Sequence, residues 1–278
     1  MVPRPGKAPQ SCDKSEVHSV RVIRWRDVSK EYRTPTIGVI VAMEEEIAVL
    51  RDRYFAAGQV DGSRARQFLA RTPSANMVLC QSGIGKVNAA LAAAEVIARF
   101  DPHILIVSGL AGSLRSDLIA GDVVVSSGAA HHDFDLRPLL GGRGILPGMS
   151  SATFSATDEL IDAARSSCQR ALDAREALGF GRHELLVGTV ASGDALVASS
   201  ARKAEITSTL PEAICVDMET AAIAQVAHIT GRDWVSIRII SDAADESFDV
   251  KDVLGFARDE GSAMIASLVQ ELSGLGSF

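Results

Sequence analysis

The chain has 278 residues, of which 47% are hydrophobic and 23% are charged, so it carries enough apolar side chains for a folded core. Its formal net charge of -7 and pI of ≈ 5.4 argue against the basic face on which nucleic-acid binding depends. Because no apolar run approaches the roughly 18 residues of a membrane span, we expect a cytoplasmic protein that binds neither nucleic acid nor membranes.

The first 34 residues differ in composition from the rest of the chain. They hold eight Lys/Arg against four Asp/Glu, together with three prolines, and they lack the apolar core of a secretory signal. We predict a flexible N-terminal extension over residues 1–34. No linker or internal repeat interrupts the sequence after that point, so we predict one domain over residues 35–278.

Short apolar segments alternate with helical segments after residue 35. This alternation predicts an α/β fold with a largely parallel sheet. The expected strands cover residues 36–41, 77–80, 104–107, 122–125, 185–190, 214–216 and 234–240. Five helices are expected. The first begins near residue 43, the second ends near residue 100, the third lies within 157–178, and the last two cover 219–229 and about 250–272.

Three consecutive carboxylates, Glu44 to Glu46, directly follow the first apolar strand. In open α/β sheets, ligands bind where strands end. If a helix begins near Met43, then Met43, Ile47 and Leu50 form one apolar stripe. At about 100° per residue, Glu46 lies closest to that stripe, whereas Glu44 and Glu45 point sideways or away. Glu46 is therefore the acid that we expect to face a pocket, and its two neighbours suit first-turn positions near the helix dipole.

Two further acids and one arginine occupy positions that require a partner. Glu219 has apolar residues at i+3, i+4 and i+7, so we place it on the buried face of a helix, with Asp217 pointing away as an N-cap. Asp242 follows an apolar strand directly. Arg238 lies inside that same strand, where an unpaired guanidinium is costly, so we expect it to pair with an acid or reach the pocket.

Other patterns carry weaker signals. The segments 82–85 and 108–113 are rich in small residues and read as turns where a ligand can approach the backbone, although neither is a complete nucleotide-binding motif. His131, His132 and Asp133 lack further ligands for a metal site. The four cysteines are far apart, and we expect them to be reduced.

The sequence resembles a known family, the 5′-methylthioadenosine/S-adenosylhomocysteine nucleosidases of the purine nucleoside phosphorylase superfamily. The resemblance rests on collinear blocks over roughly residues 36–272. The blocks are Ile37–Glu46, Ser82–Val87, Gly121–Ser126, Ser192–Ala195, and Val216–Glu219 with Ile240–Asp245.

The resemblance implies a three-layer α/β/α fold around a twisted mixed sheet, a homodimer, and hydrolysis of the N-glycosidic bond of an adenine nucleoside without metal or organic cofactor. It implies that Glu46 activates water, Asp242 protonates adenine N7, and Glu219 accepts a ribose hydroxyl beside Met218. The other substrate-binding residues that it implies are Ala42, Met43, Ser82, Gly83, Leu196, Val197 (through its backbone), Arg238 and Ser241.

The chain also departs from the family. Leu196 stands where the nucleosidases usually place a phenylalanine, Asp217 replaces a glutamate, and the segment 131–144 lacks the later aromatic residues that help line the 5′-substituent pocket. Arg143 in that segment leaves the nature of the 5′-group open. Two alternatives remain: a phosphate-dependent phosphorylase, which typically carries an arginine-containing loop where Glu44–Glu46 stand, and a nucleoside-binding protein without turnover.

Overall fold

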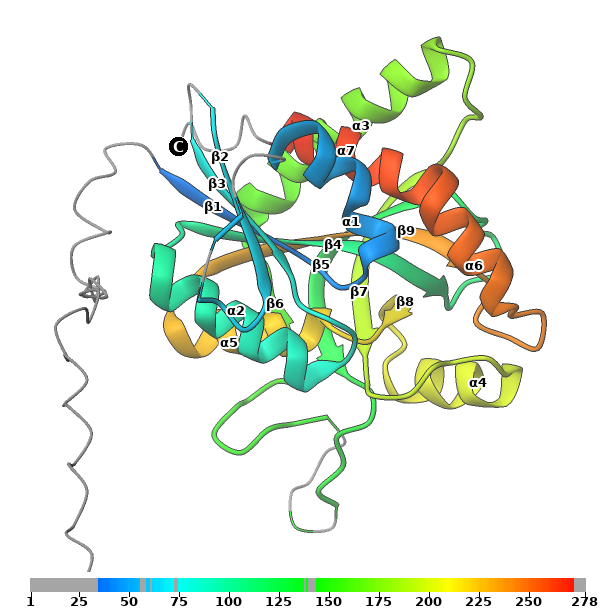
Figure 1. Ribbon diagram of the computed structural model, residues 1–278. Helices are drawn as coiled ribbons and strands as arrows, with labels where there is room; N and C mark the ends of the chain where they lie inside the picture. The colour runs from blue at the N-terminus through cyan, green and yellow to red at the C-terminus, as the bar shows by residue number, and fades with distance from the viewer. Residues whose placement is uncertain are drawn as a thin grey trace, which may run out of the picture.

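The computed structural model describes residues 35–55, 59–60, 62–72, 75–137, 139 and 144–272. The predicted extension over residues 1–34 and the open question about Arg143 lie outside these residues. The described residues form helices packed on both sides of one sheet (Figure 1). This arrangement confirms the three-layer α/β fold with a mixed sheet.

The sheet contains nine strands within the described residues. They are β1 (Thr36–Val41), β2 (Arg66–Arg71), β3 (Asn76–Gln81), β4 (Ile104–Ser113), β5 (Val123–His131), β6 (Thr153–Ser155), β7 (Leu185–Ser192), β8 (Ala213–Asp217) and β9 (Asp233–Asp242). Strands β1, β3 and β4 are parallel neighbours, whereas β2 and β6 pair antiparallel at the two ends.

Five of these strands close into a ring. The pairs β4–β9, β9–β5, β5–β7, β7–β8 and β8–β4 connect in sequence and mix parallel with antiparallel contacts. In this ring Gly112 pairs with Val216 on one side and with Asp242 on the other. The ring therefore brings the ends of β4, β8 and β9 together at one place.

Helices cover the sheet on two faces. They are α1 (Glu44–Leu50), α2 (Lys86–Phe100), α3 (Asp158–Ala177), α4 (Ser200–Thr209), α5 (Thr220–Thr230), α6 (Val250–Phe256) and α7 (Ser262–Leu272), with π-helical turns η1 (Arg51–Phe55) and η2 (Ala257–Gly261). One apolar cluster joins α1, α3 and α7 to the sheet, and a second joins α2 and α5 to its other face.

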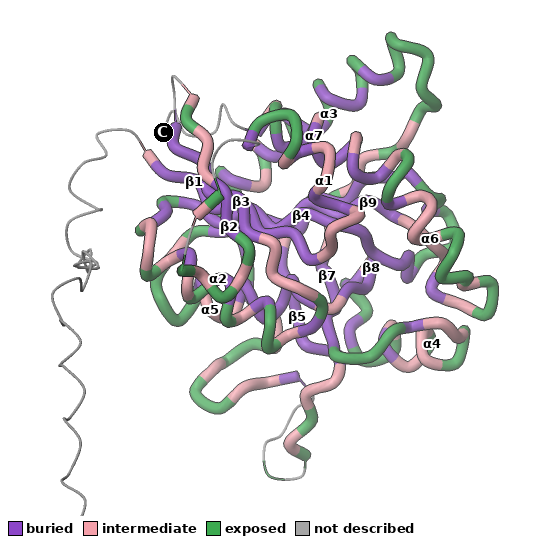
Figure 2. The backbone as a smooth tube through the Cα atoms, in the orientation of Figure 1, coloured by how far each residue is buried: buried purple, intermediate pink, exposed green. Residues whose placement is uncertain are grey.

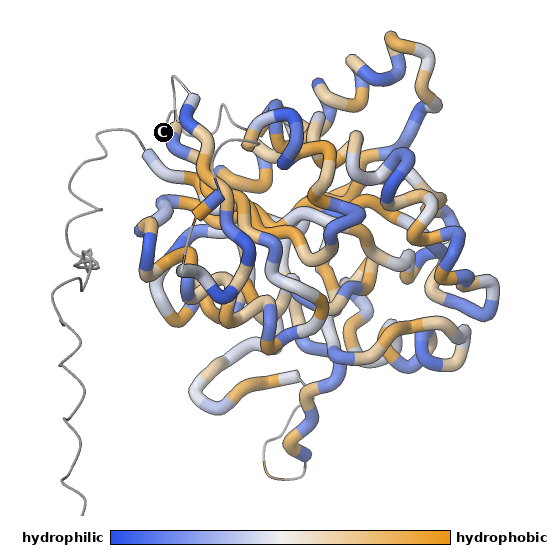
Figure 3. The backbone as a smooth tube through the Cα atoms, in the orientation of Figure 1, coloured by the Kyte–Doolittle hydropathy of each residue, from blue (hydrophilic) through white to orange (hydrophobic). Residues whose placement is uncertain are grey.

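The apolar strand pattern explains this layering. Successive strand residues point to opposite faces, so Ile37 and Val39 of β1 join the first cluster while Ile40 joins the second. β1 and β4 are buried throughout, and β3 and β5 almost throughout (Figure 2), and hydrophobic residues concentrate in these central strands (Figure 3). A sheet covered on both faces requires such continuous apolar runs.

Several expected boundaries were wrong. Residues 108–113 do not form a turn but continue β4 to Ser113, because this segment pairs with β9 on one side and, at its end, with β8 on the other. The sequence pattern also did not predict β2, β6 or α4. The expected helix over 250–272 is interrupted by the π-helical turn η2, which separates α6 from α7.

Candidate active site

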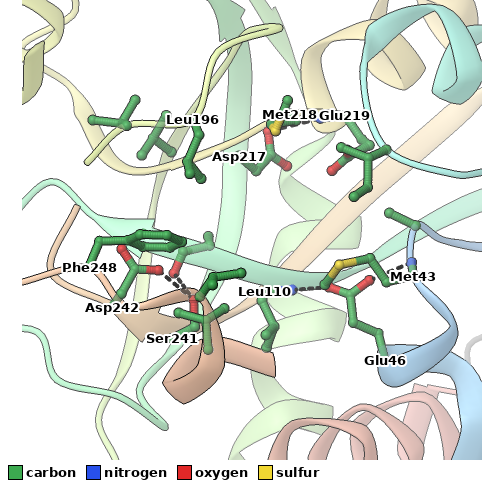
Figure 4. Close-up of a pocket in the computed structure, with 18 of the residues that line it drawn as sticks. Met43, Glu46, Leu110, Leu196, Asp217, Met218, Glu219, Ser241, Asp242 and Phe248 are labelled. Carbon is green, nitrogen blue, oxygen red and sulfur yellow. Dashed lines mark hydrogen bonds between the residues drawn. The ribbon is translucent and has the colours of Figure 1, made fainter. Parts of the chain in front are cut away.

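A cavity of ≈ 410 Å³ lies where β1, β4, β8 and β9 end. Figure 4 shows how the side chains of its lining are arranged: the acids Asp242 and Glu46 lie on opposite sides, and Met218 and Glu219 lie on the wall that faces them. Nine of the twelve residues expected from the sequence line it. They are Ala42, Met43, Glu46, Leu196, Val197, Met218, Glu219, Ser241 and Asp242.

Glu46 faces inward, as the helix geometry predicted. It is the third residue of α1, and its side chain reaches back so that Oε2 accepts a hydrogen bond from the N–H of Met43 at 2.9 Å, as in a capping box. Oε1 accepts a second bond from the N–H of Leu110 at 2.7 Å. Burial raises the pKa of Glu46 above its usual value, although both hydrogen bonds and Arg238 oppose that rise. Glu44, by contrast, pairs with Arg51 and Arg66 near the surface.

Glu219 is buried, but not for the expected reason. The sequence predicted a position on the apolar face of a helix. In the structure Glu219 is instead the N-cap residue of α5, with φ of -131°, so it lies just before the first helical turn. Its Oε1 accepts a hydrogen bond at 2.8 Å from the N–H of Gly85, which ends the loop before α2. Burial, followed by the nearby charge of Asp217, raises the pKa of Glu219 to about 7.

Asp217 and Arg238 form a buried ion pair beneath the cavity. Nη2 of Arg238 lies 2.6 Å from Oδ2 of Asp217, and both side chains are 1% exposed. The expectation that Arg238 pairs with an acid is confirmed. The expectation that Asp217 points away is wrong, because Asp217 is buried and lines the cavity, while its carboxylate still accepts bonds from the first N–H groups of α5.

Gly109 permits the close approach of these charged groups. A Cβ at this position would lie 2.5 Å from Nη1 of Arg238 and 2.8 Å from Oε1 of Glu46. Gly109 therefore leaves room for the side chains of Arg238 and Glu46 beneath the cavity, and it does not form part of a turn.

Asp242 ends β9 on the far side of the cavity from Glu46. Its Oδ2 accepts a hydrogen bond from the hydroxyl of Ser241 at 2.7 Å, and Oδ1 accepts one from the N–H of Ala244 at 2.8 Å. Each oxygen keeps a second lone-pair position for a further contact. Asp242 is thus oriented by its own turn and is half-buried at the cavity wall.

Ser82, Gly83 and Arg238 do not line the cavity. The hydroxyl of Ser82 donates to the carbonyl of Gly83, and the N–H of Gly83 donates to the carbonyl of Ala42. The first bond lies within the loop before α2, and the second joins that loop to the end of β1. Arg238 lies beneath the cavity wall, where its guanidinium pairs with Asp217 and lies near Glu46 and Glu219.

Sequence reasoning missed one complete side of the cavity. Phe248, the one aromatic side chain among the described residues of the lining, lies beside Asp242 (Figure 4), and Val250, Val253 and Leu254 add one face of α6. The spacing of the last three residues was a usable signal, since i, i+3 and i+4 share a helix face. Leu196, one of the expected substrate-binding residues, is 59% exposed at the rim of the cavity.

The two adjacent histidines make separate side-chain contacts. Nε2 of His131 contacts Gln225 at 3.0 Å, whereas Nδ1 of His132 contacts Arg202 at 3.1 Å. Burial lowers the pKa of both imidazoles. Within the described ranges, no group of three or more His, Cys, Asp or Glu residues is arranged to hold a metal ion, and Cys80, Cys168 and Cys215 are free and buried.

Comparison with known proteins shows the family to which the chain belongs. The family model described as "Phosphorylase superfamily" matches residues 36–272. The chain belongs to the phosphorylase superfamily. The matched range contains every element of the sheet and every residue that lines the cavity.

Several solved protein structures are similar to this chain in both sequence and fold. The chain is 38% identical to the 5′-methylthioadenosine/S-adenosylhomocysteine nucleosidase of Neisseria meningitidis, solved with methylthio-immucillin-A, over 86% of this chain and 98% of that one, with a TM-score of 0.73. The corresponding nucleosidase of Colwellia psychrerythraea, solved with adenine, is 29% identical over 87% and 97%, with a TM-score of 0.75. A futalosine hydrolase of Helicobacter pylori is 25% identical over 87% and 98%, with a TM-score of 0.75.

Within the described residues, no helix is long and apolar enough to cross a lipid bilayer.

Proposed function

We propose that this protein hydrolyses the N-glycosidic bond of 5′-substituted adenine nucleosides, such as methylthioadenosine or S-adenosylhomocysteine, and releases adenine. The observation that carries the proposal is the placement of Glu46, Glu219 and Asp242 around one cavity. The similarity to two nucleosidases, one of them solved with adenine, supports the same substrate class.

The two sides of the cavity suit the two halves of the reaction. Cleavage of the bond builds positive charge on the sugar and negative charge on the base. We assign Asp242 as the acid that protonates N7 of the leaving adenine, and Glu46 as the base that takes a proton from the attacking water. Because Glu46 and Asp242 lie on opposite sides (Figure 4), water and leaving base occupy opposite faces of the sugar.

Glu219 and Met218 suit the sugar. We assign Glu219 as the acceptor of a ribose hydroxyl and Met218 as an apolar contact beside the ring, since both lie on the wall between the two acids. The base would lie near the backbone of Val197, between Leu196 and Phe248. Ala42, Met43 and Ser241 complete the walls, while Ser82 and Gly83 position the loop that holds Glu219 through Gly85.

The charge of the cavity favours water over phosphate. Its described lining contains four acids and neither lysine nor arginine, and Arg238 beneath it is already paired with Asp217. A phosphorylase needs a cation that clamps phosphate. We therefore favour hydrolysis over phosphorolysis and assign no metal or organic cofactor to the reaction.

A substrate panel tests the proposal. Purified protein is incubated in phosphate-free buffer with methylthioadenosine, S-adenosylhomocysteine, 5′-deoxyadenosine, adenosine and futalosine, and the products are separated by chromatography. We expect adenine from at least one of the first three. Release that requires phosphate and yields a sugar 1-phosphate would establish a phosphorylase. A thermal shift with adenine but no release from any substrate would establish a binding protein, and release from futalosine alone would reassign the substrate.

We also propose a cytoplasmic homodimer built from one catalytic domain over residues 35–278. The support is exposed apolar side chains on α2 and the loop before it. Val87 and Leu91 are 78% and 45% exposed and share one side of α2 at i, i+4 spacing, and Ile84 in the preceding loop is 51% exposed. Ile84 also lines the cavity. A second copy covering this face would therefore adjoin the substrate.

A further inference from the structure

Three carboxyl groups surround one buried cation beneath the cavity. Counted over the whole residue, backbone included, Glu46, Asp217 and Glu219 are 2%, 7% and 7% exposed, and Arg238 is 1% exposed. If all three acids were ionised, the cluster would carry more negative charge than Arg238 can balance, and an uncompensated buried charge is costly. The acids must therefore compete for one guanidinium.

Hydrogen bonding assigns that guanidinium to Asp217. Besides Nη2 of Arg238 at 2.6 Å, the Asp217 carboxylate accepts bonds from the hydroxyls of Ser192 and Thr220 and from the N–H groups of Glu219 and Thr220. Glu46 accepts two backbone bonds and Glu219 accepts one. The more donors surround a carboxylate, the more its ionised form is favoured.

Among the described residues, the other titratable groups near the cluster supply no second positive charge. Cys215 precedes Asp217 on β8, and burial raises the pKa of its thiol, which keeps it neutral. His131 is the last residue of β5 and His132 follows it, and burial lowers the pKa of each imidazole. Within the described part of the chain, Arg238 is thus the cation that faces Glu46, Asp217 and Glu219.

We propose that Asp217 is a positioning residue that engages Arg238 and so leaves Glu46 able to accept a proton from water. The proposal rests on the proposed function, because it concerns how Glu46 performs its part of that reaction. Asp217 acts in two ways: it neutralises the guanidinium that would otherwise attract the Glu46 carboxylate, and it adds a negative charge that favours proton uptake. Both effects make Glu46 a stronger base.

The direction of a mutational change follows from these two effects. In Asp217→Asn the carbonyl oxygen can still accept bonds at the start of α5, but the negative charge is gone. Arg238 keeps its hydrogen bonds to the hydroxyl of Thr220, but its positive charge is no longer balanced by Asp217. It then stabilises the ionised forms of Glu46 and Glu219 more strongly, so the pKa of both falls. Since an opposite charge at close range shifts a carboxyl pKa by about 1–3 units, we expect the acid limb of kcat/KM to move down by about one pH unit or more. The plateau kcat falls several-fold because Glu46 is then a weaker base.

The experiment compares pH profiles of the full chain carrying Asp217→Asn, Asp217→Glu or Asp122→Asn. Asp217→Glu keeps the charge and should restore the wild-type acid limb. Asp122 is a matched control, because it is also a buried acid (2% exposed) that accepts backbone hydrogen bonds, from Ile119 and Glu184, but it does not line the cavity. Its variant should lose stability without moving the acid limb.

A ¹³C NMR titration of the glutamate carboxyls separates this proposal from the proposed function, because it needs no turnover. Signals are assigned with Glu46→Gln and Glu219→Gln. We expect both glutamates to titrate above the usual range in the wild type and to shift downward in Asp217→Asn. An unmoved acid limb or unmoved signals in that variant would overturn the proposal. If Asp217→Asn does not fold, the wild type still decides, since two glutamates with ordinary values would refute it.

Discussion

Replacement of Gly109 by alanine tests the packing beneath the cavity most directly. The new methyl carbon would lie 2.5 Å from Nη1 of Arg238 and 2.8 Å from Oε1 of Glu46, well inside van der Waals contact. Neither group can withdraw freely, because Arg238 is held by Asp217 and Glu46 by two backbone hydrogen bonds. Gly109 also has φ of 155°, which an L-residue rarely adopts.

The cost can be worked from these two sources. Overpacking of a filled interior costs about 1–3 kcal/mol, and a strained backbone conformation costs about 1–3 kcal/mol. We expect Gly109→Ala to lose about 2–6 kcal/mol of unfolding free energy, a large share of the roughly 5–15 kcal/mol typical of a folded domain. Displacement of Glu46 by about 1 Å would also reduce kcat by up to about 100-fold.

Denaturant unfolding and initial-rate kinetics at a temperature where the variant is fully folded measure the two effects separately. Gly38→Ala is the matched control. It also crowds a buried strand, at 2.8 Å from Cδ2 of Leu105 and 3.0 Å from Cγ1 of Val96, but both neighbours are apolar side chains on the α2 face. It should lose stability and keep its kcat. Wild-type kcat and stability in Gly109→Ala would refute the reasoning.

Four further predictions concern the cavity and the α2 face. Glu46→Gln and Asp242→Asn should fold normally and lose about 10²–10⁴-fold in kcat; wild-type turnover in either would remove its assigned role. Glu219, whose pKa rises on folding from an ordinary 4.5 to about 7, binds its proton more tightly in the folded state, so its contribution to stability is fully present below about pH 4.5 and is lost as the pH rises to 7. Denaturant melts should therefore show stability falling across that window by roughly 2–3 kcal/mol, and a Glu219→Gln variant with an equally steep fall would exclude this source. Val87→Asp should convert a dimer to a monomer in light scattering, because a charge would be placed on the exposed apolar face of α2; an unchanged mass would move the interface elsewhere. Leu196→Phe should lower KM for adenine nucleosides by about 2–12-fold, the equivalent of the roughly 0.5–1.5 kcal/mol of an aromatic stacking contact, and an unchanged KM would place the base away from this residue.

Local patterns determined much of this protein from the sequence alone. Apolar strands alternating with helices predicted the layered α/β fold, because each strand must be buried on both faces. Helix phase placed Glu46 toward the interior, since α1 begins where its apolar stripe predicts. The position of Asp242 at the end of an apolar strand likewise needed no knowledge of distant residues.

Tertiary structure alone decided how the acids are paired. The closed ring of strands brings Arg238 of β9 against Asp217 of β8, and Glu219 reaches Gly85 across 134 residues of sequence. The phase of α5 suggested burial of Glu219, but an N-cap position and a long-range hydrogen bond produce it. Side-chain periodicity reports which face of an element is buried; it does not report which charged group lies opposite, because that depends on how elements distant in the sequence pack together.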